Sequence, residues 1–203
     1  MLAGVAVSLV ADFLVRVSGK VDIYDTCFKS LPMPTGVVAE EIISRIVALT
    51  FTGNSFQIEK ERIFNRFENK VPFPEIITND LKRRMALIEI DVLVAISIGI
   101  TLDELIQIYS VQFPVFKSYE IVDLYDLHGN RLPNTTRKEA GAKEVRELLE
   151  KNDGVAPITV SWDIDNGIQK MTQTFYPPFQ NVDRIVDYKA VYGSFEGRSD
   201  FKS

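Results

Sequence analysis

"LKRRMALIEIDVLVAISIGITLDELIQIYSVQF", residues Leu81–Phe113, is the most regular stretch of the chain and predicts the centre of the fold. Its first half predicts a helix over residues 80–98. The apolar run from Leu87 to Leu102 is too short to span a bilayer and contains two acidic residues, so we expect a buried helix. Gly99 then suits the left-handed position that ends many helices.

A second helix is predicted immediately after this glycine. Thr101 and Glu104 have the spacing of a capping box, and a Phe-Pro dipeptide stops the helix after about Gln112. Two helices joined in this way are similar to a helix-turn-helix unit, whose second helix enters the major groove of DNA. Here the second helix begins with Asp103 and Glu104 and carries no Lys or Arg, so we interpret the pair as a packed helical hairpin instead.

Toward the N-terminus, residues 3–17 predict a helix that is apolar nearly all round. Such a helix needs a neighbour, and we expect it to pack against another subunit or another part of a larger protein. The alternating stretch 20–28 predicts a strand. Thr35 is placed to cap a helix over 37–50, and a short charged helix is predicted over 57–70.

Toward the C-terminus, the patterns are mixed. A strand over 119–126, a turn, a helix over 137–151, a hairpin around an Asp-Asn-Gly turn and a last helix over 181–197 are predicted. The predicted fold class is therefore α+β, mostly helical with a β-hairpin and short strands. It forms one domain or two lobes, with residues 1–115 as a helical lobe and residues 116–203 as an α+β lobe.

Composition excludes several classes of site and protein. The chain has 23 basic and 28 acidic residues and a net charge of −5, which argues against avid nonspecific binding to nucleic acid. The lone Cys27 excludes an internal disulfide framework and fits a reducing cytoplasm. One cysteine and one histidine exclude a Cys/His zinc cluster. No stretch reads as a membrane span or a signal peptide.

Two basic segments are candidates for DNA contact. The loop-rich segment His128–Lys143 offers cationic and amide side chains that suit phosphates and base edges. The second candidate is a basic run at the start of the predicted central helix, whose residues point around the helix; a solvated helix start is the alternative. An ordinary polar surface loop is the alternative for the first segment. The candidate DNA-binding residues are Arg131, Asn134, Arg137, Lys138, Lys143, Lys82, Arg83 and Arg84.

The stretch "TFYPPFQNVDR", Thr174–Arg184, contains a Tyr-Pro-Pro-Phe sequence. Amino-group DNA methyltransferases use an Asn/Asp-Pro-Pro-Tyr/Phe loop whose first side chain accepts a hydrogen bond from the target amino group. Tyr176 cannot place an amide oxygen there, and no glycine-rich cofactor loop follows a strand upstream. We interpret the two prolines as a stiff exit from a hairpin strand.

The chain resembles the C-terminal, specificity and helical region of adenine-specific DNA methyltransferases of type II restriction-modification and phage-defence systems. Four stretches carry the resemblance, and they occur in the same order. They are "VSLVADFLVRVSGKVDIYDTCFKSLPMP" (7–34), "LKRRMALIEIDVLVAISIGITLDELIQIYSVQFPVF" (81–116), "YEIVDLYDLHGNRLP" (119–133) and "TFYPPFQNVDRIVDYKAVYGSFE" (174–196).

The resemblance implies a target-recognition or scaffold portion of a DNA-modification protein. It implies double-stranded DNA and a methyltransferase catalytic domain or subunit as partners, with catalysis and the cofactor site in that other part. By itself the chain is then not an enzyme, binds no cofactor or metal, and works in the cytoplasm away from membranes. The alternative is a non-catalytic protein-interaction subunit, or a split-gene remnant, without DNA contact.

Overall fold

A computed structural model describes residues 1–19, 25–53, 56, 58–59, 61–62, 75–164 and 167–198 of the chain. The prediction of an α+β fold that is mostly helical is confirmed. The helices are α1 (Leu2–Ala6), α2 (Leu9–Val17), α3 (Asp25–Ser30), α4 (Gly36–Thr50), α6 (Asp80–Ser97), α7 (Leu102–Gln112), α8 (Pro114–Glu120), α9 (Ala142–Asn152) and α10 (Arg184–Glu196). The strands are β1 (Leu124–Tyr125), β2 (Ile158–Ile164), β3 (Gln169–Phe175) and β4 (Gln180–Asn181).

The structure divides into two compact units. Unit 1 takes in the described residues of Met1–Thr78, Lys82–Phe113 and Ile185–Ser203, and unit 2 comprises Asn79–Leu81 and the described residues of Pro114–Arg184. We expected a lobe of residues 116–203, whereas the division groups the C-terminal helix with unit 1. The physical reason is that side chains of α10 bond to α6, as described below.

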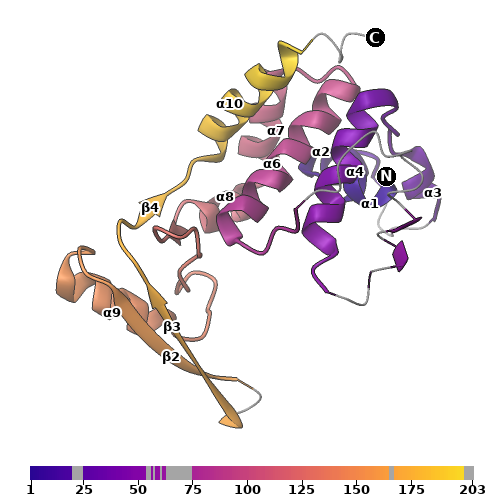
Figure 1. Cartoon of the computed structure of the whole chain (residues 1–203). Coiled ribbons are helices and arrows are strands. Elements are labelled where there is room, and N and C mark those ends of the chain that lie inside the picture. The colour runs from indigo at the N-terminus through magenta and orange to yellow at the C-terminus, as the bar shows by residue number, and fades with distance from the viewer. Residues whose placement is uncertain are drawn as a thin grey trace. The chain divides into compact units, whose positions relative to one another are not determined.

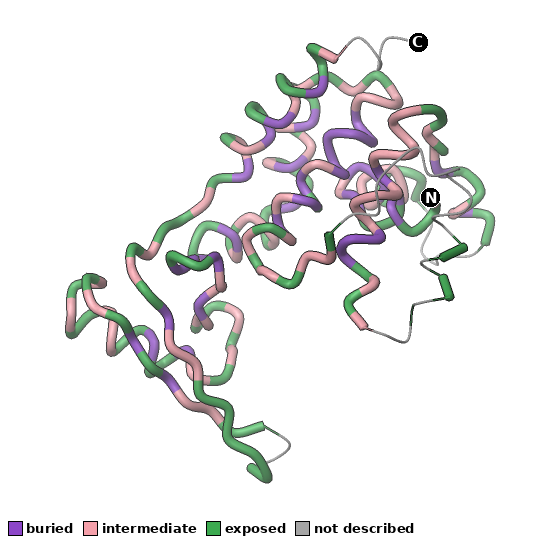
Figure 2. Tube along the Cα trace, viewed as in Figure 1, coloured by how far each residue is buried: buried purple, intermediate pink, exposed green. Residues whose placement is uncertain are grey.

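Helix α6 is the core of unit 1 (Figure 1). Six consecutive residues, Ile90 to Ala95, are buried, so this section of the helix is covered on every side (Figure 2). The buried helix predicted from its apolar run is thus confirmed. Gly99 has a φ of +77° after its end, as predicted, and Thr101 and Glu104 form the predicted capping box at the start of α7.

The N-terminal segment is two helices rather than the single helix predicted over 3–17. Ser8 ends the first helix because its hydroxyl donates to the carbonyl of Val5, at 2.7 Å, and accepts from the N–H of Ala11, at 3.1 Å. Val5 and Val10 are fully buried within the chain itself, since α1 packs on α4 and α2 packs on α7. The chain's own core therefore supplies part of the neighbouring surface that this segment needs.

One predicted strand is wrong where the structure describes it, and another is much shorter than predicted. Asp25–Ser30 is helical, while residues 20–24 of the strand predicted over 20–28 lie outside the described residues. The strand predicted over 119–126 shrinks to Leu124–Tyr125, because Pro114 starts α8, which continues to Glu120. Proline favours the first position of a helix, where its missing N–H removes no intrahelical hydrogen bond.

Smaller differences concern helix starts and caps. Thr35 occupies the N-cap of α4 but its side chain makes no capping hydrogen bond. The helix predicted over 137–151 begins only at Ala142, because Gly141 has a φ of +76°. The helix predicted over 57–70 lies mostly outside the described residues.

The predicted hairpin is the centre of unit 2. β2 and β3 pair antiparallel from Ile158↔Phe175 to Ile164↔Gln169, and Gly167 in the turn has the expected positive φ of +87°. Helix α9 covers one face of this hairpin (Figure 1). The core beneath α9 consists of Leu132, Val145, Ile158, Val160 and Phe175, with Trp162 packed against it.

Two helical glycines in unit 1 should respond oppositely to substitution by alanine. A Cβ at Gly4 would overlap Cγ2 of Ile42, so we expect Gly4→Ala to destabilise unit 1 by about 1–3 kcal/mol. A Cβ at Gly193, in α10, would meet no atom within 4 Å, so Gly193→Ala should stabilise it by about 0.5–1 kcal/mol. Thermal unfolding followed by far-UV circular dichroism measures both. A gain of stability in Gly4→Ala would contradict the close packing of α1 on α4.

Candidate nucleic-acid interface

Two of the predicted DNA-binding arginines are held by acidic residues. Asp123, 3% exposed, accepts from Nε of Arg137 at 3.0 Å and from its Nη2 at 2.6 Å. Asn134 also donates to Asp123, at 2.8 Å. Arg131 bonds Glu139 through both of its Nη atoms and reaches Asp123 at 3.4 Å. These side chains form one polar cluster, which we call the Asp123 cluster.

The arginines and carboxylates of the Asp123 cluster stabilise each other's charged forms. Burial raises the pKa of Glu139, but hydrogen bonds from Arg131 and from the N–H of Asn134 outweigh it, so the pKa lies below its usual range. The hydrogen bond to Glu139 raises the pKa of Arg131, and that to Asp123 raises the pKa of Arg137. Counting only the acids within the segment missed Asp123, which lies outside it. Arg131, Asn134 and Arg137 are therefore structural in the described chain.

Two lysines of the same segment remain exposed. Lys138 and Lys143 line a hollow of about 510 Å³ together with Thr135, Ser161, the first turn of α9 and two acidic residues, Glu139 and Glu144. Neither lysine makes an ion pair with any described residue. Gly141, the N-cap of α9, offers no side chain to the first turn, whose N–H groups favour anions. The hollow thus joins two ammonium groups, hydroxyl groups and a helix N-terminus, which bind anionic oxygen atoms, with two carboxylates, of which that of Glu139 is paired with Arg131.

Lys138 has an unusual backbone conformation for a non-glycine residue. Its φ is +55°, in the left-handed region, and its N–H donates to the carbonyl of Thr135 at 3.1 Å. The tight turn at 135–138 places the side chain of Arg137 toward Asp123, since the N–H of Arg137 also donates to Asn134, at 2.9 Å. The cluster and the exposed lysine are therefore products of the same turn.

The second candidate for DNA contact is the basic run Lys82–Arg84 at the start of α6. The alternative interpretation, that all three side chains are solvated, does not hold either. Arg84 is 7% exposed and its Nη1 bonds Asp187 of α10 at 2.6 Å. Arg83 donates to the carbonyls of Leu49 and Ile77, at 2.9 and 2.8 Å. Only Lys82 of the three is classed as exposed. Two of the three cations are thus occupied within the fold, and the run offers little surface for a phosphate.

The stretches that carry the sequence resemblance meet through buried polar pairs. In unit 1, Arg84 bonds Asp187, and Asp91, 2% exposed, accepts from the hydroxyl of Tyr188 at 2.7 Å. Asp91 also accepts from the N–H of Leu9 at 2.8 Å, so three of the stretches converge on α6.

In unit 2, Arg184 bonds Glu120 at 2.8 and 3.0 Å, and both residues are at most 5% exposed. This pair joins the third stretch to the fourth. These paired residues of the four stretches therefore help to hold each unit together.

The Tyr-Pro-Pro-Phe sequence leaves β3 as predicted. Tyr176 follows the last residue of β3, and its N–H lies 3.3 Å from a carboxylate oxygen of Asp126. Asp126, fully buried, also accepts from the N–H groups of His128 and Asn130 and so closes the turn before them. Sequence reasoning did not single out this aspartate, although an Asp two residues before a turn residue is a common turn signal.

Other site types find no support in the described residues. Within the ranges given above, no group of three or more His, Cys, Asp or Glu residues could hold a metal ion. Over the same ranges, no helix has the length and apolar character that crossing a membrane requires. Comparison with family models, with curated proteins and with solved structures found no match. The candidate interface is therefore the hollow lined by Lys138 and Lys143.

Proposed function

We propose that this chain is a target-recognition or scaffold portion of a DNA-modification protein, and that it contributes to DNA binding and not to catalysis. The observation that carries the proposal is the hollow in unit 2, where Lys138 and Lys143 are exposed beside Thr135 and Ser161, although Glu139 and Glu144 also line it. Phosphate oxygens of a duplex are bound by such lysines, hydroxyls and helix N-termini. The four ordered stretches that resemble adenine-specific methyltransferases support the same role.

Under this proposal, unit 2 contacts the DNA backbone and does not act on the bases chemically. The catalytic step and its cofactor belong to a methyltransferase domain or subunit with which the chain works. Duplex binding by the chain alone should be weak, since its net charge is −5 and two lysines supply only a small electrostatic attraction. The arginines of the Asp123 cluster act indirectly, because they fix the turn that presents Lys138.

Removing both lysine charges should flatten the salt dependence of duplex binding. Each phosphate contact contributes about 0.9 to the slope of log K against log salt, so Lys138→Asn with Lys143→Gln should lower the slope by up to about 1.8. Asparagine is chosen at position 138 because it tolerates the left-handed backbone found there. Fluorescence anisotropy of a labelled duplex, titrated with salt, measures the slope.

The matched control removes two other exposed lysines of unit 2. Lys151→Gln with Lys170→Gln changes the net charge equally but leaves the hollow intact, and its slope should stay near that of the wild type. If both double variants lowered the salt slope equally, the attraction of the duplex would depend on net charge alone, and the hollow would not be a DNA-binding site. No duplex binding by the wild type at low salt would favour the protein-interaction alternative.

A further inference from the structure

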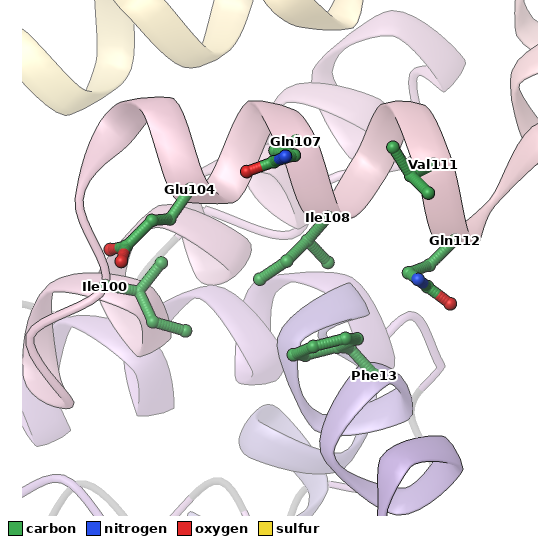
Figure 3. Close-up of a pocket in the computed structure, with 7 residues that line it drawn as sticks. All are labelled: Phe13, Ile100, Glu104, Gln107, Ile108, Val111 and Gln112. Carbon is green, nitrogen blue, oxygen red and sulfur yellow. The ribbon is translucent and has the colours of Figure 1, made fainter.

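A groove in unit 1 lies between α2 and α7 and is separate from the lysine hollow. It has a volume of about 350 Å³ and is lined by Phe13, Ile100, Glu104, Gln107, Ile108, Val111 and Gln112. Figure 3 shows Phe13 on α2 facing the side of α7 that carries Ile108 and Val111. Val111 is 61% exposed although it is a large aliphatic residue. The groove thus contains apolar side chains that no described residue covers fully.

The lining has the spacing of a helix-packing surface. On α7 the lining residues recur three and four positions apart, from Glu104 to Gln112, and so form one stripe along that helix. The stripe is roughly 12 Å long, or about two helical turns. Two packed helices with an open stripe between them match the side-chain rows of a third helix. An amphipathic helix is therefore the occupant that this shape fits.

The charge of the groove is uneven along its length. At one end α7 begins with Asp103 and Glu104, and α7 contains no Lys or Arg. The hydrogen bonds that Glu104 accepts from the N–H and hydroxyl of Thr101 lower its pKa, so its carboxylate stays ionised at neutral pH. Burial, and then the negative charges of Glu196 and Glu104, raise the pKa of the nearby Tyr192. This end therefore has a negative potential.

The opposite end carries no compensating excess of positive charge. Arg16 lies there with its guanidinium carbon 4.9 Å from the ring centre of Phe113, but it is paired with Asp12 at 2.9 Å. Four of the seven lining residues are apolar and two are glutamines, so the groove is partly apolar, neutral at the Arg16 end and acidic at the Glu104 end. A ligand that complements it is apolar with a cation at one end.

We propose that this groove binds an amphipathic helix of a partner protein, which presents large apolar side chains to Phe13, Ile108 and Val111 and a lysine or arginine to Glu104. The apolar contacts supply the affinity, since they remove exposed aliphatic and aromatic surface from water. The cation sets the direction in which the helix lies, because only one end of the groove is acidic. The inference does not depend on DNA binding by unit 2.

The test uses two synthetic helical peptides with the full-length chain. Both have leucines on one face; one has lysines beside that face, and the other has glutamates at the same positions. We expect the lysine peptide to bind with a Kd on the order of 10 μM and the glutamate peptide to bind about threefold to fivefold more weakly. Fluorescence anisotropy of the labelled peptides measures both constants.

Three variants locate the binding in the groove. Val111→Lys should weaken the lysine peptide about tenfold, because it places a charge among the apolar side chains of the groove. Val186→Lys is the matched control, since Val186 is 60% exposed on α10 and does not line the groove; it should leave the Kd unchanged. Glu104→Gln keeps a side chain that can form the capping box but removes the charge that lines the groove, so the preference for the lysine peptide should shrink while Asp103 still contributes a negative charge.

Several results would overturn the proposal. These are no binding of the lysine peptide, equal binding of the two peptides by the wild type, or equal weakening by Val111→Lys and Val186→Lys. Sedimentation of the chain alone supplies a further test. A concentration-dependent dimer that Val111→Lys abolishes would assign the groove to a second copy of the chain instead of to a partner helix.

Discussion

Replacing Arg184 with alanine is expected to lower the free energy of unfolding of unit 2 by about 3–5 kcal/mol, the largest loss expected of any single substitution in this unit. Arg184 and Glu120 are 4% and 5% exposed and share two hydrogen bonds, of 2.8 and 3.0 Å. The Arg184 guanidinium carbon also lies 5.0 Å from the ring centre of Phe116. Removing the arginine leaves a buried carboxylate without the charge that offsets its desolvation.

The paired substitution separates this effect from a simple loss of packing. Glu120→Leu with Arg184→Met removes both charges and keeps much of the volume, so it should recover most of the stability that Arg184→Ala loses. Trp162 is the single tryptophan of the sequence and packs beside the core of unit 2, so its fluorescence during urea unfolding reports on this unit. A double variant as unstable as Arg184→Ala would show that the ion pair itself is required.

Asp123→Ala should have the second largest effect, a loss of about 2–4 kcal/mol in unit 2. It removes the acceptor for Arg137 and Asn134 and one of the two acids that face Arg131. The loss should be smaller than that of Arg184→Ala, because the two arginine side chains are 26% exposed and water can solvate them in part. The turn that presents Lys138 depends on these contacts, so duplex binding should also weaken.

The control for Asp123→Ala is a surface ion pair of the same unit. Arg146 and Glu150 lie 3.9 Å apart on α9 with 60% and 71% of their side chains exposed, so Glu150→Ala should change the unfolding free energy by less than about 0.5 kcal/mol. Urea unfolding followed by Trp162 fluorescence compares the two variants. Similar stabilities for Asp123→Ala and Glu150→Ala would mean that the Asp123 cluster does not hold unit 2 together.

Local signals explain which parts of the fold were predictable. The glycine Gly99 just after α6, the capping box of α7 and the turn of the β2–β3 hairpin each depend on residues within a few positions of one another. The sequence is less informative where one residue is compatible with two different structures. Pro114 stops α7, but it also begins α8, and the alternating residues after it were interpreted as a strand that the structure shows only at Leu124–Tyr125.

The candidate site was less predictable, because the partners of the basic residues lie far away in the sequence. Arg84 meets Asp187 across 103 positions, and Arg137 meets Asp123 across 14. A count of charges within one segment cannot detect such pairs. Of the four lysines and arginines of the predicted segment, Lys138 and Lys143 are the two that remain exposed and make no ion pair among the described residues. No local pattern distinguishes them from the arginines beside them.

The division of the chain into units has a consequence for biosynthesis. Every residue of unit 2 precedes Ile185, whereas unit 1 needs α10 to cover Asp91 and Arg84. On the ribosome, unit 2 can therefore fold while the nascent unit 1 still lacks a helix of its core. Until α10 emerges, α6 exposes apolar surface and lacks the hydrogen bonds that Asp187 and Tyr188 of α10 make to Arg84 and Asp91, and exposed apolar surface of this kind is what chaperones bind.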